Sequence, residues 1–212
     1  MQKIIETNQA TIIGAVDSTF EYSHEVFGEK YYTLHVLANR LSGEYDRIPL
    51  TISERLIDIT QDYSGEIIKV TGQLRSYNKH ISETKSKLII SVFVRDLEFM
   101  DEQPDATNSN TIILDGYLCK NPIYRKTPLG REIADVLLAV NRPYGKSDYI
   151  PSITWGRDAK YISSMGIGTR VKVIGRLQSR EYIKKLTDTE EEKRTVYELS
   201  ISRLEVVDDY ES

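Results

Sequence analysis

The stretch Arg170-Val-Lys-Val-Ile-Gly-Arg-Leu-Gln-Ser-Arg-Glu-Tyr182 is typical of a β-strand with two different faces. Alternate residues of a strand point to opposite sides, and here the residues of one side are apolar or small. Those residues are Val171, Val173, Gly175, Leu177 and Ser179. The other side carries four cations and an aromatic ring, at Arg170, Lys172, Arg176, Arg180 and Tyr182. We interpret the apolar side as a barrel interior, whereas the cationic side is either a binding surface or an ordinary solvated face.

This stretch has a counterpart in the first half of the chain, which indicates an internal duplication. Val70-x-Gly72-x-Leu74 matches Val173-x-Gly175-x-Leu177 at a spacing of 103 residues. Four earlier pairs keep a spacing of 102: Gly14 with Gly116, Gly28 with Gly130, Asn39-Arg40 with Asn141-Arg142, and Ile48-Pro49 with Ile150-Pro151. The polar segment 101–109 between the two units is typical of a linker. We therefore predict two domains, residues 1–101 and 110–208.

The order of predicted elements in the second unit is that of a five-stranded barrel. We expect strands at 110–118, 133–141, 148–155, 170–182 and 195–207, with a short helix carrying Ala159, Ile162 and Met165 before the fourth strand. The first unit gives the same order, with Leu56 and Ile59 on its helix. The predicted fold class is all-β with short helices, as two tandem five-stranded barrels of the oligonucleotide-binding (OB) type.

The composition of the 212 residues excludes several classes of function. No run of apolar residues is long enough for a membrane span, and the N-terminal residues lack a secretory signal pattern, so we expect a cytoplasmic protein. The single cysteine, Cys119, forms no internal disulfide, and His24, His35 and His80 are scattered. We therefore expect no metal site and no cofactor.

The net charge of −4 conceals a difference between the two halves. Residues 1–105 carry 11 Lys and Arg against 17 Asp and Glu, a balance of −6, whereas residues 106–212 carry 17 against 15, a balance of +2. Such a difference favours separate roles for the halves. We expect the first unit to bind nucleic acid weakly and to serve assembly.

Aromatic residues near the cationic strand point to the chemistry of the second unit. The only tryptophan, Trp155, ends the third strand, with Tyr149 earlier on it and Tyr144 in the preceding loop. Aromatic platforms beside a cationic groove bind single strands with little sequence preference. The alternatives are that Trp155 caps the barrel core and that the tyrosines are ordinary half-buried residues. At the matched positions of the first unit stand Ser53, Arg47, Ser42 and, for Tyr182, Lys79.

The motifs of the second unit resemble those of the bacterial single-stranded DNA-binding protein family, over nearly the whole unit. The matching motifs are Asn110-x-x-Ile-Leu-x-Gly116-x-Leu-x-x-Asn-Pro122, Leu138-Ala-Val-Asn-Arg142, Ile150-Pro-Ser-Ile-Thr-Trp-Gly156 and Gly168-x-x-Val-x-Val-x-Gly-Arg-Leu-Gln-Ser-Arg180. The resemblance implies binding of single-stranded DNA in replication, recombination and repair, without catalysis. It places the family's stacking aromatics at Tyr144, Tyr149, Trp155 and Tyr182.

The predicted site joins these aromatic residues to the nearby cations. We predict as nucleic-acid-binding residues Trp155, Tyr149, Tyr144, Tyr182, Arg142, Lys172, Arg176 and Arg180. The resemblance also implies a homodimer with four barrels in all. Residues 206–212 lack the terminal Pro-Phe that recruits other replication proteins in this family, so we expect no recruitment by that route.

Three other functions were weighed against single-stranded DNA binding. An enzyme is not expected, because neither unit has a nucleophile motif or a phosphate-binding glycine loop. A protein-interaction or primosome-like assembly factor, with secondary nucleic-acid contact, is the main alternative, and the acidic first unit favours it. RNA as the ligand also stays open, since a stacking groove does not by itself exclude a 2′-hydroxyl.

Overall fold

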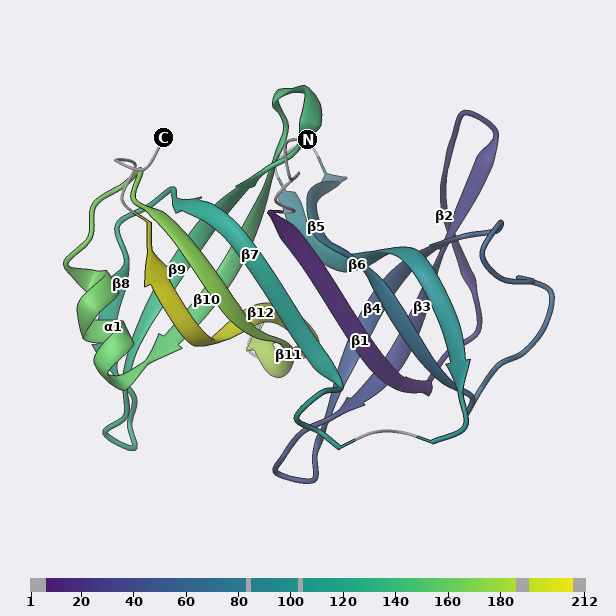
Figure 1. Cartoon of the computed structure of the whole chain (residues 1–212), viewed down its shortest axis with the longest axis horizontal. Coiled ribbons are helices and arrows are strands. Elements are labelled where there is room, and N and C mark those ends of the chain that lie inside the picture. The colour runs from purple at the N-terminus through teal and green to yellow at the C-terminus, as the bar shows by residue number, and fades with distance from the viewer. Residues whose placement is uncertain (1–6, 83–84, 103–104, 186–190, 208–212) are drawn as a thin grey trace, which may run out of the picture.

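The computed structural model is dominated by β-strands and describes residues 7–82, 85–102, 105–185 and 191–207 (Figure 1). The first half contains β1 (Asn8–Val16), β2 (Glu21–Val26), β3 (Glu29–Asn39), β4 (Tyr45–Ser53), β5 (Ile67–Ser82) and β6 (Lys85–Met100). The second half contains β7 (Asn110–Leu118), β8 (Ile123–Lys126), β9 (Glu132–Asn141), η1 (Pro143–Gly145), β10 (Ser147–Trp155), α1 (Gly156–Ser163), β11 (Arg170–Lys185) and β12 (Glu191–Val206).

The strand pairings form two closed rings of five strands each. In the first half the ring runs β3-β4-β6-β5-β1 and closes because β1 also pairs with β3. In the second half it runs β9-β10-β12-β11-β7 and closes through β7 and β9. A closed barrel in which the first of the five strands pairs with the second and the fourth is an OB fold. The fold class predicted from the sequence is therefore confirmed.

The inner faces of the strands follow the predicted alternation. On β11, Val171, Val173 and Leu177 are fully buried, whereas Lys172 and Arg180 are exposed. Gly72 and Gly175 lie where the register with the neighbouring strand shifts. A Cβ at these positions would lie 2.0 Å from the Phe93 carbonyl oxygen and 2.3 Å from that of Ser200. The repeated glycine is thus required by the close approach of two strands.

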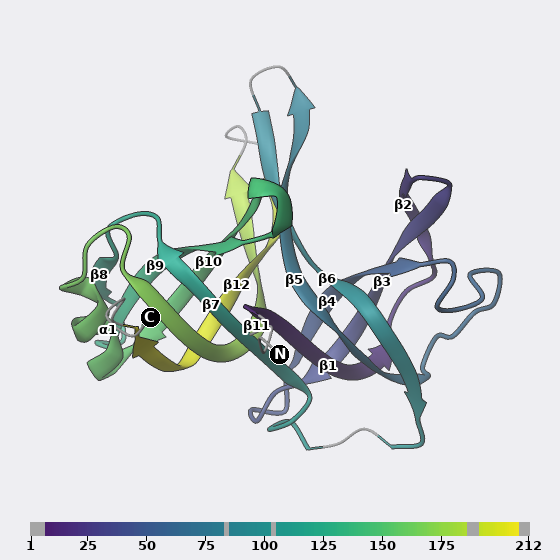
Figure 2. The same cartoon turned by 45° about the horizontal axis from the view of Figure 1, so that its top comes forward.

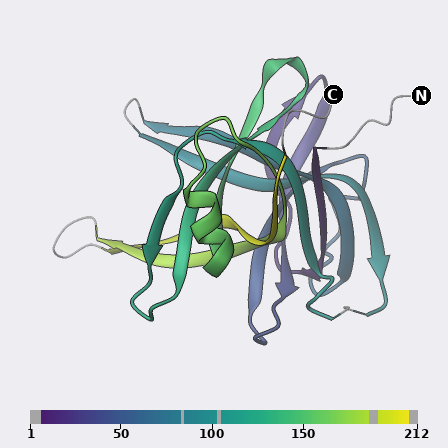
Figure 3. The same ribbon diagram turned by 60° about the vertical axis from the view of Figure 1, so that its left-hand side comes forward.

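The first unit differs from the prediction because it has no helix between β4 and β5. Residues 54–66, which are all described, form turns. The Asp58 carboxylate accepts hydrogen bonds from the amide and hydroxyl of Thr60, and Asp62 does the same for Ser64. Such local bonds compete with helix formation. In the second unit the predicted helix is present as α1, which packs beside β9 (Figure 3).

Two short strands were not predicted. β2 and β8 pair with β3 and β9 as hairpins and stand at the two ends of the strand order. Their side chains are almost all exposed, so they show no alternation of apolar and polar residues from which a strand can be predicted.

The two barrels are related by an approximate two-fold axis between β1 and β7, which lie side by side in the centre of the molecule (Figure 1). Ala10 pairs with Ile112, its own counterpart in the repeat, while Asn8 pairs with Leu114 and Ile12 with Asn110. An antiparallel pair centred on equivalent residues is the geometry of an isologous contact. The repeated units therefore pack as a homodimer does, within one chain.

Two clusters of one aspartate and two arginines join the barrels, and we call them the Arg-Asp-Arg triads. Asp46 bonds Arg40 of its own barrel and, at 2.6 Å, Arg176 of the other. Asp148 likewise bonds Arg142 of its own barrel at 2.5 Å and Arg75 of the other at 3.1 Å.

Backbone contacts complete each triad. The Ser179 amide donates to Asp46 at 2.9 Å and the Ser76 amide to Asp148 at 2.6 Å. Both carboxylates are 1 % exposed or less, so each triad is a buried cross-link between the barrels.

Two long hairpins extend beyond the barrels. Figure 2 shows β5 with β6 and β11 with β12 projecting from the same side of the molecule, and Figure 3 shows the same from another direction. Because β11 and β5 also belong to the barrel walls, the hairpins continue the barrel surface outward.

Replacing the buried aspartate of one triad will destabilise the protein far more than replacing an exposed one. Asp148→Asn leaves Arg142 and Arg75 facing each other without a countercharge, and we expect a loss of about 3 kcal/mol in unfolding free energy. Asp135→Asn is the control, because Asp135 pairs with Arg125 at 2.7 Å but is 41 % exposed. Its loss should not exceed about 1 kcal/mol. Equal losses in urea unfolding would contradict a structural role for the triad.

Candidate nucleic-acid interface

The outer face of β10 carries two of the predicted stacking residues. Tyr149 and Trp155 point to the same side of this strand because they are six residues apart, which places them about 20 Å from each other. Their exposed fractions are 48 % and 39 %. Both rings are therefore open to solvent.

Trp155 is held at the surface by its neighbours across the sheet. It pairs with Ile133 on β9, which in turn pairs with Arg125 on β8. Ile133 is only 1 % exposed although it faces outward, as expected for a residue covered by flanking side chains. The Trp155 indole N–H donates to the Ser200 hydroxyl on β12 at 3.3 Å. The alternative that Trp155 is a core residue capping the barrel is therefore wrong.

Between the two rings the outer face is largely apolar. The side chains that share this face of β9 and β10 with the rings are Ile133, Asp135, Leu137, Ala139, Pro151 and Ile153, of which only Asp135 is charged, and it pairs with Arg125. We call this surface the apolar floor. Apolar side chains can contact the faces of flat rings, whereas they offer no hydrogen-bonding groups that distinguish one base from another.

Tyr144 lies in η1, the loop that leads into β10. Its ring is 99 % exposed, and its φ of +64° is in the left-handed region that residues other than glycine rarely adopt. Gly145 follows with a φ of +67°, and two consecutive residues of positive φ are typical of a tight turn between two hairpin strands, here β9 and β10. The turn holds the Tyr144 side chain open to solvent, and its contact with nucleic acid stays a prediction.

The predicted cations Arg142 and Arg176 are engaged in the Arg-Asp-Arg triads. Arg142 also donates to the Ser76 carbonyl oxygen at 2.9 Å, across the barrel contact. Both side chains keep part of their surface open, 26 % for Arg142 and 39 % for Arg176. With two guanidinium groups on one carboxylate, each triad retains a net charge of about +1. Their contact with phosphate stays a prediction, whereas their structural contacts are shown.

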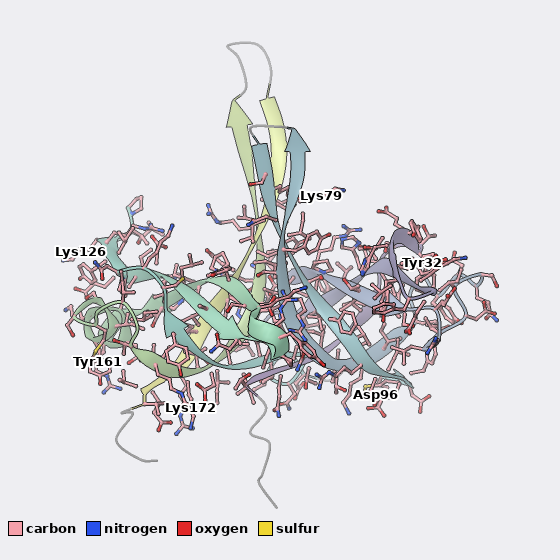
Figure 4. All side chains as sticks on the ribbon, turned by 90° about the horizontal axis from the view of Figure 1, so that it is seen from above. Tyr32, Lys79, Asp96, Lys126, Tyr161 and Lys172 are labelled. Carbon is pink, nitrogen blue, oxygen red and sulfur yellow. The ribbon has the colours of Figure 1, made fainter. Side chains whose placement is uncertain are left out.

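Lys172 and Arg180 are exposed but lie apart. Lys172 is opposite Asp115 on one neighbouring strand and Glu205 on the other. Figure 4 shows it on the side of the molecule opposite the projecting hairpins, near which Lys79 lies. Arg180 is eight residues further along β11, toward its hairpin. The structure therefore does not bring Lys172 together with the other predicted cations.

Tyr182 is placed only by its backbone. It pairs with Arg194 near the end of the β11–β12 hairpin, and its side chain lies outside the described residues. Its predicted contact with nucleic acid stays a prediction.

The sequence interpretation missed Arg125, which lies in line with Ile133 and Trp155. The Arg125 guanidinium pairs with Asp135 at 2.7 Å and is half exposed. The run Ile123-Tyr124-Arg125-Lys126 contains both an aromatic residue and two cations, which was the available signal. It was overlooked because the short strand β8 was not predicted.

The described part of the chain offers neither a cluster of metal ligands nor a membrane-spanning helix. There, no three His, Cys, Asp or Glu side chains gather as metal ligands would. None of the helices described has the length and hydropathy to span a bilayer.

The two OB barrels, one of which carries exposed aromatic rings with cations nearby, place the protein in the class of oligonucleotide-binding folds. Residues 109–207 match the model described as "Single-strand binding protein family".

Curated relatives resemble the same half. "Single-stranded DNA-binding protein A" of Bacillus subtilis (strain 168) is 38% identical over 80 residues, which cover 34% of this chain and 46% of the relative. "Single-stranded DNA-binding protein 1" of Staphylococcus aureus (strain COL) is also 38% identical over 80 residues, covering 34% and 48%. The chain thus spans about half the length of the curated relatives it matches.

A solved structure resembles the whole chain. The wild-type single-stranded DNA binding protein from Thermus aquaticus superposes with a TM-score of 0.72 at 21% identity, covering 97% of this chain and 95% of that one. A deletion mutant of the same protein gives a TM-score of 0.70 at 22% identity, with 96% of each chain covered. At this identity the likeness shows a shared fold across both barrels.

Proposed function

We propose that the protein binds single-stranded DNA without reading its sequence, on the outer face of the second barrel. The observation that carries this proposal is the pair of exposed rings, Trp155 and Tyr149, on either side of the apolar floor. The match of residues 109–207 to the single-strand binding protein family model supports DNA as the ligand. From the same resemblance we infer roles in replication, recombination and repair.

Stacking explains why such a face tolerates any sequence. Each base has a flat π-face whatever its identity, and each base-aromatic stack contributes about 1–3 kcal/mol. Rings about 20 Å apart on one strand are reached by a segment several nucleotides long, in agreement with the about 4–16 nucleotides that one OB fold binds. The ring of Tyr144 extends this surface beyond the start of β10.

Cations around this face attract the phosphate backbone. Arg180 is exposed on β11, Arg125 flanks the row of Trp155, and each triad contributes a net charge of about +1. These charges belong to the second barrel or to its contact with the first, and they explain how a chain with net charge −4 can bind a polyanion.

We also propose that residues 1–101 and residues 110–208 have different roles. The second barrel supplies the main DNA site, and the first supports assembly through β1 and the triads. The protein acts as a binding protein and not as an enzyme, in the cytoplasm. These statements are supported by the family resemblance and by the contacts between the barrels.

Trp155 provides a direct test, because it is the single tryptophan. Oligo-dT should quench its fluorescence, and Trp155→Ala should weaken binding by about 1–3 kcal/mol, measured with a fluorescently labelled oligonucleotide. Tyr161→Ala is the control, since Tyr161 on α1 is 48 % exposed but lies off the apolar floor. The proposal fails if neither quenching nor a difference between the two variants is observed, a result that would favour an assembly factor.

The salt dependence of binding tests whether the cations near the aromatic face contact the phosphates of the DNA. Arg180→Gln should reduce the slope of log K against log salt by about 0.7, the value for one phosphate contact on a single strand. Arg157→Gln is the matched control, because Arg157 is 96 % exposed and lies on α1 instead of β11. An unchanged slope for Arg180→Gln would show that phosphates follow a different path.

We also infer a homodimer, so that two chains supply four barrels. The supporting argument is the resemblance to a family that presents four barrels. Light scattering should give twice the mass of one chain. A value equal to one chain, at concentrations where DNA binding is complete, would contradict the dimer.

A further inference from the structure

The first barrel has no tryptophan at the position that matches Trp155. The corresponding outer face of this barrel nevertheless carries aromatic residues. Ser53 stands where Trp155 stands in the second barrel, and Tyr31 pairs with Ser53 just as Ile133 pairs with Trp155. Phe93 on β6 is next to Thr51 of β4, as Ser200 on β12 is next to Ile153 of β10. In the first barrel the rings of this face therefore stand on the two strands beside β4.

These rings are in contact with one another across the outer face. The Tyr31 and Phe93 ring centroids are 5.5 Å apart with planes inclined by 35°. The His24 ring on β2 stacks on Tyr31, at 5.0 Å and 10°. Tyr31 and Phe93 can meet above β4 because the strand between them carries only the small side chains of Thr51 and Ser53. We call His24, Tyr31 and Phe93 the aromatic row.

The aromatic row lies outside the barrel core and is open to solvent. The buried residues of the core cluster are all aliphatic. His24 is exposed, and Tyr31 and Phe93 are half-buried. A core packing role therefore does not explain why three rings line up on this face.

A hollow adjoins the aromatic row and leads to the second barrel. It has a volume of about 290 Å³, and its lining includes His24, Phe93, Tyr77, Ser76, Arg75 and Arg142. Tyr77 is 50 % exposed. The Tyr149 amide donates to the Ser76 hydroxyl at 2.7 Å, so the hollow lies next to the strand that carries Tyr149 and Trp155.

The charges near the hollow suit a polyanion. Arg75 and Arg142 share the Asp148 carboxylate, which leaves a net charge of about +1 at the hollow. Glu29 lies beside the aromatic row, and a hydrogen bond from Ser53 lowers its pKa, so it is charged at neutral pH. Arg55 lies 3.3 Å from it and offsets that charge.

We propose that the first barrel holds a second base-stacking site, formed by the aromatic row and the adjoining hollow. Its occupant is the single strand that occupies the second barrel, which passes from Tyr149 by Ser76 into the hollow. This inference rests on the proposed function and adds a site to it. It replaces the expectation, drawn from the matched positions alone, that the first unit contributes weakly to binding.

Moving the single tryptophan from position 155 to position 93 allows binding at the second site to be measured separately from binding at the first. In the double variant Trp155→Phe/Phe93→Trp the single indole reports only on the aromatic row, and we expect oligo-dT to quench it. The control is Trp155→Phe/Phe99→Trp, because Phe99 is 51 % exposed on the same strand but packs on Tyr63 at 5.4 Å, away from the hollow. Its fluorescence should not change. An unquenched indole at position 93, in a variant that unfolds like the parent, would overturn the second site.

The two proposals fail in different ways. If wild-type Trp155 is quenched while the indole at position 93 is not, the DNA-binding function stands and the second site is wrong. If neither is quenched, the proposed function itself is wrong.

The length of the oligonucleotide gives an independent measurement. Phe93→Leu keeps an apolar side chain and removes the ring, so it should weaken binding of an oligo-dT long enough to reach both barrels by about 5- to 150-fold. A short oligo-dT that fills only the second barrel should bind the variant as it binds the parent. Equal effects on short and long oligonucleotides would contradict the proposed path.

Discussion

The antiparallel pairing of β1 with β7 is the contact on which the arrangement of the molecule depends. It is centred on equivalent residues, Ala10 and Ile112, and so it sets an approximate two-fold axis through the chain. In a two-fold contact, each interaction of one barrel with the other occurs a second time with the two barrels exchanged. The two Arg-Asp-Arg triads follow from this symmetry, because each needs an arginine from the opposite barrel.

The triads also determine which cations are available for nucleic acid. A carboxylate as deeply buried as Asp46 or Asp148 requires a countercharge, and here two arginines and a backbone amide satisfy it. Arg142 and Arg176 therefore have a structural function first, although each carries surplus positive charge. This arrangement ties the charge of the binding surface to the contact that holds the barrels together.

The two barrels offer the same face with different chemistry. In the second, one large ring stands on β10 next to Ile133, and the surface beside it is apolar except for the ion pair of Asp135 with Arg125. In the first, three smaller rings on β2, β3 and β6 meet above a strand of small residues. A sheet allows this exchange because directly opposite residues on neighbouring strands share one surface, so a ring can move one strand sideways and still face the same ligand.

Patterns formed by residues close together in the sequence were sufficient to predict the fold. The alternation in β11, the repeated glycine before Leu74 and Leu177, and the order of the strands predicted two OB barrels, and those barrels are observed. The same reasoning failed for the helix expected at Leu56 and Ile59, where side-chain bonds of Asp58 and Asp62 favour turns. It also failed for β2 and β8, whose exposed side chains have no periodic pattern.

The sequence by itself determined which residues could form a binding face, because residue type and strand parity place Trp155 and Tyr149 on one side of β10. Only the tertiary structure decided which of the candidates act together. It tied Arg142 and Arg176 to buried carboxylates, set Lys172 apart, and joined His24, Tyr31 and Phe93 from three strands. The physical reason is that ion pairs and ring contacts form between strands distant in the chain, and their register is fixed by the closure of the barrels.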